Sequence, residues 1–268
     1  MDAFLAQYAG SSMFLRSNCH RHGLADFGLP LQGTWLAKVN MGEIVGVVCH
    51  SRRGTILLQA PDDVEVLAIA VAEHTKREVK GLIGPWEQSC KARHALGKDQ
   101  ADTSLDSCED LFEILLDDLI VPSKLAKGEI TVRHATAADQ PLLLKWQFAY
   151  EQALFGDQAT PDGARETFES FLSQNALWVA TREGDPVSQS AFNAQLPDCV
   201  QVGGVFTPPK LRGHGYARCA VAGSLLEARN QGVKRSILFT AKDNTPARRA
   251  YVSLGYKIIG DFGLTFFR

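Results

Sequence analysis

The segment Leu211–Ala217, with the sequence LRGHGYA, lies between an extended segment and a helix. Val200–Thr207 before it is rich in β-branched residues and predicts a strand that ends at Pro208-Pro209. After it, apolar residues recur at the spacing of one helix face: Ala217, Val221, Leu225 and Ala228. A glycine loop that opens a helix points several backbone N–H groups into one concavity, and the helix dipole adds positive potential there. The segment therefore predicts a phosphate-binding loop.

Spacing separates the kinds of phosphate-binding loop. A P-loop ends in Gly-Lys-Ser/Thr, whereas here Gly215 is followed by Tyr216 and Ala217. The dinucleotide pattern G-x-G-x-x-G needs glycine or alanine at position 218, which is Arg218. The pattern Arg/Gln-x-x-Gly-x-Gly/Ala remains, and Arg212, Gly215 and Ala217 match it.

A second pattern follows near the end of the sequence. Asn244 precedes Tyr251 by seven residues, and a Gly255-Tyr256 turn comes next. Ser236–Thr240 predicts the strand that leads into this segment. Thr245 suits the cap of a helix, Pro246 suits its first turn, and Gly255 suits the position past its end.

The two patterns, in this order and each at a strand-to-helix junction, resemble the signatures of the GNAT superfamily of acyl-CoA-dependent N-acyltransferases. The resemblance implies that the loop binds the diphosphate of coenzyme A, with acetyl-CoA as the acyl donor and no metal. A backbone N–H near Val205 or Phe206 is expected to stabilise the oxyanion, on a strand that the Gly203-Gly204 pair predicts to be bulged. The cofactor-binding residues implied by the resemblance are Val205, Phe206, Thr207, Arg212, Gly213, His214, Gly215, Tyr216, Ala217 and Asn244.

Tyr251 is the predicted general acid, because a phenol with a pKa of about 10 is protonated at neutral pH and can donate to the departing thiolate. Many relatives place a glutamate base on the strand before the loop, but the corresponding stretch here is Cys199–Val202. Glu151 is a candidate for contacting the amine, Asp198 is a second one acting through water, and deprotonation by ordered water alone stays open. Tyr251 as a packing residue and Asn244 as a helix cap are the structural alternatives.

The fold class predicted for residues 129–268 is α/β (α+β): a mixed, mostly antiparallel sheet flanked by helices, as in the GNAT fold. Residues 1–125 predict a smaller GNAT-like domain without the cofactor loop, in which Pro85 removes an N–H after Gly84. Asp110–Leu119 predicts an amphipathic helix that Val121-Pro122-Ser123 ends. The other predicted helices cover 64–72, 138–154 and 161–174, and the strands include 33–39, 44–49, 56–58, 177–182 and 187–193.

Composition narrows the function classes. The net charge is −2 and 45% of residues are hydrophobic, with no signal-peptide pattern and no apolar run near the roughly 20 residues that span a bilayer. These features and six scattered cysteines predict a cytoplasmic protein, monomeric or homodimeric, without membrane or metal partners. Residues 205–257 hold ten basic and two acidic residues but no nucleic-acid-binding motif. The expected acceptor is a small-molecule or peptide amine; an inactive acyl-CoA-binding sensor or scaffold is the alternative.

Overall fold

A computed structural model describes residues 1–268 and divides them into two compact units. The first unit comprises Met1–Phe112, Phe239–Asp243 and Ile258–Arg268, and the second comprises Glu113–Leu238 and Asn244–Lys257. These units differ from the predicted ranges 1–125 and 129–268, because the unit borders fall inside three strands. The strands are β5 (Thr103–Leu115), β10 (Arg235–Ala241) and β11 (Lys257–Phe267).

In the first unit, two helices are followed by three strands, a helix, a strand and a further helix. In order they are α1 (Asp2–Gln7), α2 (Met13–His22), β1 (Gly33–Asn40), β2 (Glu43–Ser51), β3 (Thr55–Gln59), α3 (Val64–Thr75), β4 (Gly81–Pro85) and α4 (Trp86–Ala95). The strand order is β1-β2-β3-β4-β11-β5. Strands β1 to β3 are antiparallel, and β4 is parallel to β3.

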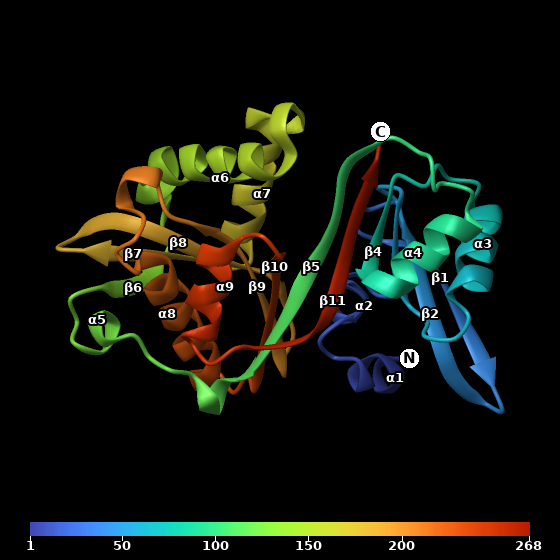
Figure 1. Ribbon diagram of the computed structural model, residues 1–268, viewed down its shortest axis with the longest axis horizontal. Helices are drawn as coiled ribbons and strands as arrows, with labels where there is room; N and C mark the ends of the chain where they lie inside the picture. Colours follow the sequence, from blue (N-terminus) through green and yellow to red (C-terminus); the bar gives the residue numbers. More distant parts are fainter. The chain divides into compact units, whose positions relative to one another are not determined.

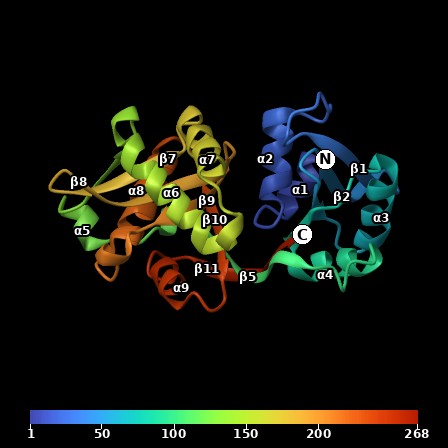
Figure 2. The ribbon, with the colours of Figure 1, turned by 90° about the horizontal axis from the view of Figure 1, so that it is seen from above.

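Side chains along β2 alternate between the two faces of this sheet, so β2 contributes to a hydrophobic core on each face. Val48 packs with α3 and α4 on one face, while Val47 and Cys49 pack with α1 and α2 on the other. Figure 2 shows the two helix pairs on opposite sides of the strands. A sheet covered on both faces explains why β2 reads as an almost continuous apolar run.

After α5 (Ser123–Ala126) and β6 (Thr131–His134), the second unit repeats this element order. Its further elements are α6 (Gln140–Phe155), α7 (Pro161–Ser173), β7 (Leu177–Arg182), β8 (Asp185–Gln195), β9 (Cys199–Phe206), α8 (Tyr216–Asn230), the start of β10, and α9 (Thr245–Val252). The strand order is β10-β9-β8-β7-β6; only the β9–β10 pair is parallel. Helices α6 and α7 cover one face and α8 the other (Figure 1). The predicted mixed, mostly antiparallel sheet flanked by helices is confirmed.

Helix α8 packs very closely on the sheet at Gly223. A Cβ added there would lie 2.4 Å from Cβ of Val132 on β6, so only glycine permits this approach. On the face of the sheet away from α8, Leu177 of β7 stands beside its strand partner Ala191 of β8. This close contact fixes the helix axis, and with it the position of the loop that precedes the helix. The structure contains no helix that combines the length and the apolar composition needed to span a bilayer.

The predicted helix over 110–119 is wrong. Residues up to Leu115 belong to strand β5, and a short 3₁₀ turn covers Leu116–Asp118. Phe112, Ile114 and Leu116 are buried while Leu115 is half exposed, which is the two-residue period of a strand. The additional apolar residues Leu111 and Leu119 complete a helix-like spacing, and this misled the prediction.

A buried carboxylate anchors the start of α6. Asp139 accepts hydrogen bonds from both terminal nitrogens of Arg133, at 2.7 and 2.8 Å, and from the backbone and hydroxyl of Thr136. The Arg133 guanidinium, helped by Thr136, holds the pKa of Asp139 well below its usual range against the opposing effect of burial. This carboxylate joins strand β6 to the following helix.

We expect Asp139→Asn to lower the melting temperature by about 2–4 °C at pH 7, because it removes a charge-assisted hydrogen-bond network. A carboxyl whose folded pKa is lowered stabilises fully above its unfolded pKa of about 3.9, and that contribution is lost as pH falls towards the folded pKa. The difference between variant and wild type should therefore shrink at pH 3, which calorimetric scans at both pH values will measure. An equal difference at both would contradict the assignment.

Candidate functional site

Strand β9 is bulged at its glycine pair. Gln189 of β8 pairs with Phe206, and Ala191 pairs with Gly203, so Gly204 and Val205 both stand opposite the single residue Ser190. Gly204 has a φ of +57°, which glycine adopts readily. The bulge predicted from the sequence is confirmed.

Strand β9 leaves its parallel neighbour before it reaches the bulge. The two strands pair over Cys199–Gln201 and Arg235–Ile237, and Val202–Phe206 continue past this paired segment. Phe206 is buried against the Trp146 ring of α6, at 6.1 Å between centroids, whereas Val205 is partly exposed. A strand end of this kind has backbone groups available to pair with an extended ligand.

The glycine loop connects β9 to α8 through a 3₁₀ turn at Pro209–Leu211. Gly213 and Gly215 have φ values of +81° and +79°, so both need the left-handed region. No backbone N–H of residues 213–218 donates a hydrogen bond within the protein; the first to do so is that of Cys219, to the Gly215 carbonyl at 3.2 Å. The exposed loop thus offers a run of N–H donors at a helix N-terminus, the arrangement that binds phosphate.

Cationic side chains surround these donors. Arg212 Nε donates to the Thr207 carbonyl at 3.1 Å, and an added Cβ at Gly215 would lie 2.8 Å from Nε of Arg218. Lys124, from the segment before β6, donates to the His214 carbonyl at 3.1 Å. The sequence offered no signal for Lys124, because 90 residues separate it from its partner. Three positive charges therefore border the loop.

His214 and Tyr216 form a stack beside the loop. Their rings are nearly parallel, with centroids 5.5 Å apart, and Nδ1 of His214 lies 2.9 Å from the Arg212 carbonyl. Arg182 donates to the Tyr216 hydroxyl at 3.4 Å. His214 is exposed, whereas Tyr216 is 4% exposed and packs in the core. The pair stiffens the loop at the point where the helix begins.

The second signature forms the start and end of α9. Asn244 caps the helix, its Oδ1 accepting from the Ala247 N–H at 3.3 Å; the prediction that Thr245 caps it is wrong, since Thr245 is the first helical residue. Tyr251 lies edge-on to Tyr256, with centroids 6.0 Å apart. The Tyr256 hydroxyl lies 2.7 Å from Oγ of Ser236, and burial raises the pKa of Tyr256 strongly. Tyr256 is thus a buried structural phenol, and Tyr251 is the more accessible of the two.

The two carboxylates considered for the amine occupy different places. Glu151 on α6 accepts from Nε2 of the buried Gln147 at 2.9 Å, and an added Cβ on Gly163 of α7 would lie 3.9 Å from it. Asp198 lies in the β8–β9 hairpin, where its carbonyl accepts from the N–H groups of Lys234 and Arg235. Val205 lies seven residues along the chain from Asp198, about 23 Å in an extended strand. Of the two, Glu151 stays the candidate for the amine.

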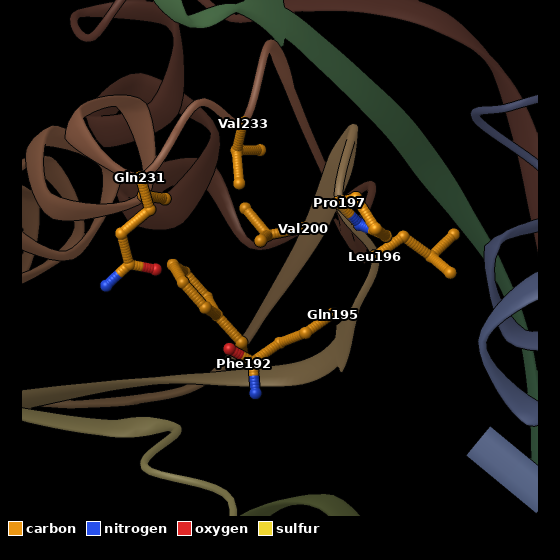
Figure 3. A pocket seen from close by; sticks show the side chains of 8 residues that line it. Phe192, Gln195, Leu196, Pro197, Val200, Gln231 and Val233 are labelled. Atoms are coloured by element: carbon orange, nitrogen blue, oxygen red, sulfur yellow. The ribbon is translucent and has the colours of Figure 1, made fainter. Parts of the chain in front are cut away.

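A pocket of about 310 Å³ opens at that same far end (Figure 3). The residues that line it are Phe192, Gln195, Leu196, Pro197, Val200, Ala228, Gln231 and Val233. Ala228 lies twelve residues along α8 from Tyr216, about 18 Å from the glycine loop. This pocket is therefore separate from the predicted cofactor site. No group of three or more His, Cys, Asp or Glu side chains is arranged to hold a metal ion.

The first unit has no comparable loop at the equivalent junction. Only Ala60–Asp63 connect β3 to α3, and Asp63 pairs with Lys38 at 2.5 Å. The Ala60 N–H donates to Oε1 of Gln88 at 2.7 Å. An added Cβ on Gly84 would lie 2.6 Å from the Leu58 carbonyl, so β4 stays close beside β3 beyond their paired residues. At this junction the Ala60 N–H is therefore satisfied within the unit, and the two strands do not part.

Comparison with known proteins agrees with this geometry. The family model described as "Acetyltransferase (GNAT) family" matches residues 142–256. A similar solved structure is a GNAT-family acetyltransferase from Colwellia psychrerythraea, with 15% sequence identity and a TM-score of 0.55 over 99% of this chain and 97% of that one. A Drosophila protein is 10% identical, with a TM-score of 0.67 over 99% of this chain and 93% of that one. A GCN5-related N-acetyltransferase from Sphaerobacter thermophilus is 14% identical, with a TM-score of 0.57 over 96% of this chain and 92% of that one. No curated protein matches the chain. Residues 142–256 are thus similar in sequence to the GNAT family of acetyltransferases.

Proposed function

We propose that the protein is an N-acetyltransferase that moves the acetyl group of acetyl-CoA to a primary amine of a small molecule or peptide. The observation that carries the proposal is the run of N–H donors from Gly213 to the first turn of α8, bordered by Lys124, Arg212 and Arg218. Positive charges around such donors suit the diphosphate of coenzyme A. The bulged β9 leads directly into this loop, so a carrier held there can extend along the strand.

The proposed reaction is a direct attack in a ternary complex. The neutral amine nitrogen attacks the thioester carbonyl carbon, and the developing oxyanion is stabilised by a backbone N–H at Val205 or Phe206. Losing such a donor costs about 3 kcal/mol in comparable sites. The C–S bond then breaks, and Tyr251 donates its phenolic proton to the thiolate and is reprotonated by solvent. The amine loses its excess proton to water, which balances the proton that returns to Tyr251, so the products are an amide and free coenzyme A.

Glu151 is proposed to contact the acceptor amine. Its carboxylate is held by Gln147, which is 2% exposed, so its orientation is set before substrate arrives. Asn244 is proposed to contact the pantetheine arm in addition to capping α9, because its side chain caps through Oδ1 and its Nδ2 can donate.

We further propose that the first unit is a second copy of the fold that has lost its acyl carrier. The two units share their element order, and the parallel pair β3–β4 corresponds to β9–β10. In the first unit Gln88 accepts from the Ala60 N–H, and Gly84 lies against Leu58 at the position at which the strands of the second unit part. Its role is then structural, or it shapes the acceptor site.

Release of free thiol from acetyl-CoA tests the proposal. Purified protein is incubated with acetyl-CoA and a panel of primary amines, and coenzyme A is measured with a thiol reagent. We expect release that depends on the amine, at a rate typical of enzymes, about 1–1,000 per second. If coenzyme A raises the melting temperature but no amine gives release, the protein is a binding protein and the proposal is wrong.

A further inference from the structure

Two neighbouring residues of β8 hold the bulge of β9 from opposite faces of the sheet. Ser188 Oγ donates to the Phe206 carbonyl at 2.9 Å, and Gln189 Nε2 donates to the Gly204 carbonyl at 3.2 Å. Ser188 is 0% exposed and Gln189 is 1% exposed. We call this pair the bulge clamp. Its two hydrogen bonds end on the carbonyls that flank Val205.

The chemistry of Gln189 is unusual for a buried strand. Its Oε1 is buried and accepts no hydrogen bond, so half of the amide is desolvated without compensation. A buried acceptor without a partner costs about 1–3 kcal/mol. An apolar residue of similar length would avoid that cost at this position. The gain from the amide is therefore local: it fixes the Gly204 carbonyl, and with it the peptide plane that carries the Val205 N–H.

The clamp also reaches the glycine loop. Ser188 gives its single hydroxyl proton to the Phe206 carbonyl, so the 2.8 Å contact with Oγ1 of Thr207 has Thr207 as donor. The Thr207 carbonyl in turn accepts from Nε of Arg212. One chain of hydrogen bonds thus joins β8, the end of the bulged strand and the first cation of the loop.

We infer that Ser188 and Gln189 are positioning residues for acetyl transfer: by holding the carbonyls on either side of Val205 they orient the Val205 N–H without touching the substrate. The inference rests on the proposed function. Misplacing an oxyanion donor by about 1 Å can slow a reaction about 100-fold, while the binding of a distant diphosphate is unaffected. The clamp should therefore act on kcat rather than on affinity for coenzyme A.

The test compares Gln189→Met with Ser190→Ala. Methionine keeps the length of the side chain but cannot donate, and Ser190 is a matched control, since it is 0% exposed on the same strand and its Oγ has no hydrogen-bond partner. We expect Gln189→Met to lower kcat about tenfold or more, with the Kd of coenzyme A within twofold of wild type by calorimetry. Ser190→Ala should keep wild-type kcat. Deuterium exchange of the peptide covering 202–208 should rise only in Gln189→Met.

A second variant covers the case in which methionine disturbs folding. In Gln189→Glu the buried carboxyl donates to the Gly204 carbonyl while it is protonated and repels that carbonyl once it ionises. The ratio of its kcat to that of wild type should therefore fall as pH rises. An active wild type with unchanged kcat in Gln189→Met, or a flat ratio in Gln189→Glu, would overturn the clamp and leave the proposed function standing. An inactive wild type would overturn both.

Discussion

Replacing Gly215 by glutamate is expected to raise the Kd of coenzyme A at least about 100-fold. Gly215 has a φ of +79°, where a side chain costs about 1–2 kcal/mol, and the new carboxylate would stand among the N–H groups proposed to hold the diphosphate. A 100-fold rise in Kd corresponds to a loss of roughly 2.8 kcal/mol of binding free energy. Titration calorimetry with coenzyme A measures the loss.

Gly232 provides a control at the other end of the same helix. It also has a positive φ, +96°, and an added Cβ meets nothing within 4 Å. Gly232→Glu therefore carries similar backbone strain and the same charge, but far from the loop. We expect it to bind coenzyme A as wild type does. Equal affinity in both variants would show that the loop does not bind the diphosphate.

Replacing Tyr251 by phenylalanine is expected to lower kcat about 100-fold while coenzyme A still binds with its normal affinity. The substitution removes one oxygen and the proton proposed for the departing thiolate, and general acid catalysis contributes about 100-fold or more. Thiol release under saturating acetyl-CoA measures kcat, and calorimetry measures the affinity. Unchanged affinity together with a lower kcat would show that the substitution slows the chemical step and does not disturb the fold.

Tyr256 supplies the matched comparison. Its buried hydroxyl contacts Ser236, so Tyr256→Phe leaves that serine without its partner and should cost about 1 kcal/mol of stability. It should leave kcat unchanged. If Tyr256→Phe slows turnover as much as Tyr251→Phe, the effect comes from the packing of the two rings, and the role proposed for Tyr251 is wrong.

Local sequence patterns were sufficient to predict several helices and strands of the second unit. Leu177–Arg182 and the helix after the glycine loop lie where periodicity placed them, and the Gly203-Gly204 pair predicted the bulge. The prediction for residues 110–119 was wrong because Leu111 and Leu119 added a helical period to the two-residue pattern of strand β5. The helices α1 and α2 had no counterpart among the predicted elements.

Long-range contacts were beyond these patterns. Ser188 and Gln189 contact the end of β9 only because the hairpin register pairs Gln189 with Phe206, and no spacing in the sequence encodes that register. Lys124 reaches the loop through the path of the chain before β6. Asn244 is the cap in place of Thr245 because the cap is the last residue before the helix whose dihedral angles are not helical. The sequence alone does not fix which residue that is. The roles of Tyr251 and Glu151 stay predictions.

The last strand has a consequence for biogenesis. Residues Phe262–Phe266 of β11 pair with Gly81–Pro85 of β4, although they are synthesised some 180 residues later. Until they emerge from the ribosome, β4 presents an open hydrogen-bonding edge, the kind of surface that invites mispairing between nascent chains. Maturation of the amino-terminal unit therefore waits until β11 has been synthesised, and an expression clone cut near residue 125 would yield an aggregation-prone product.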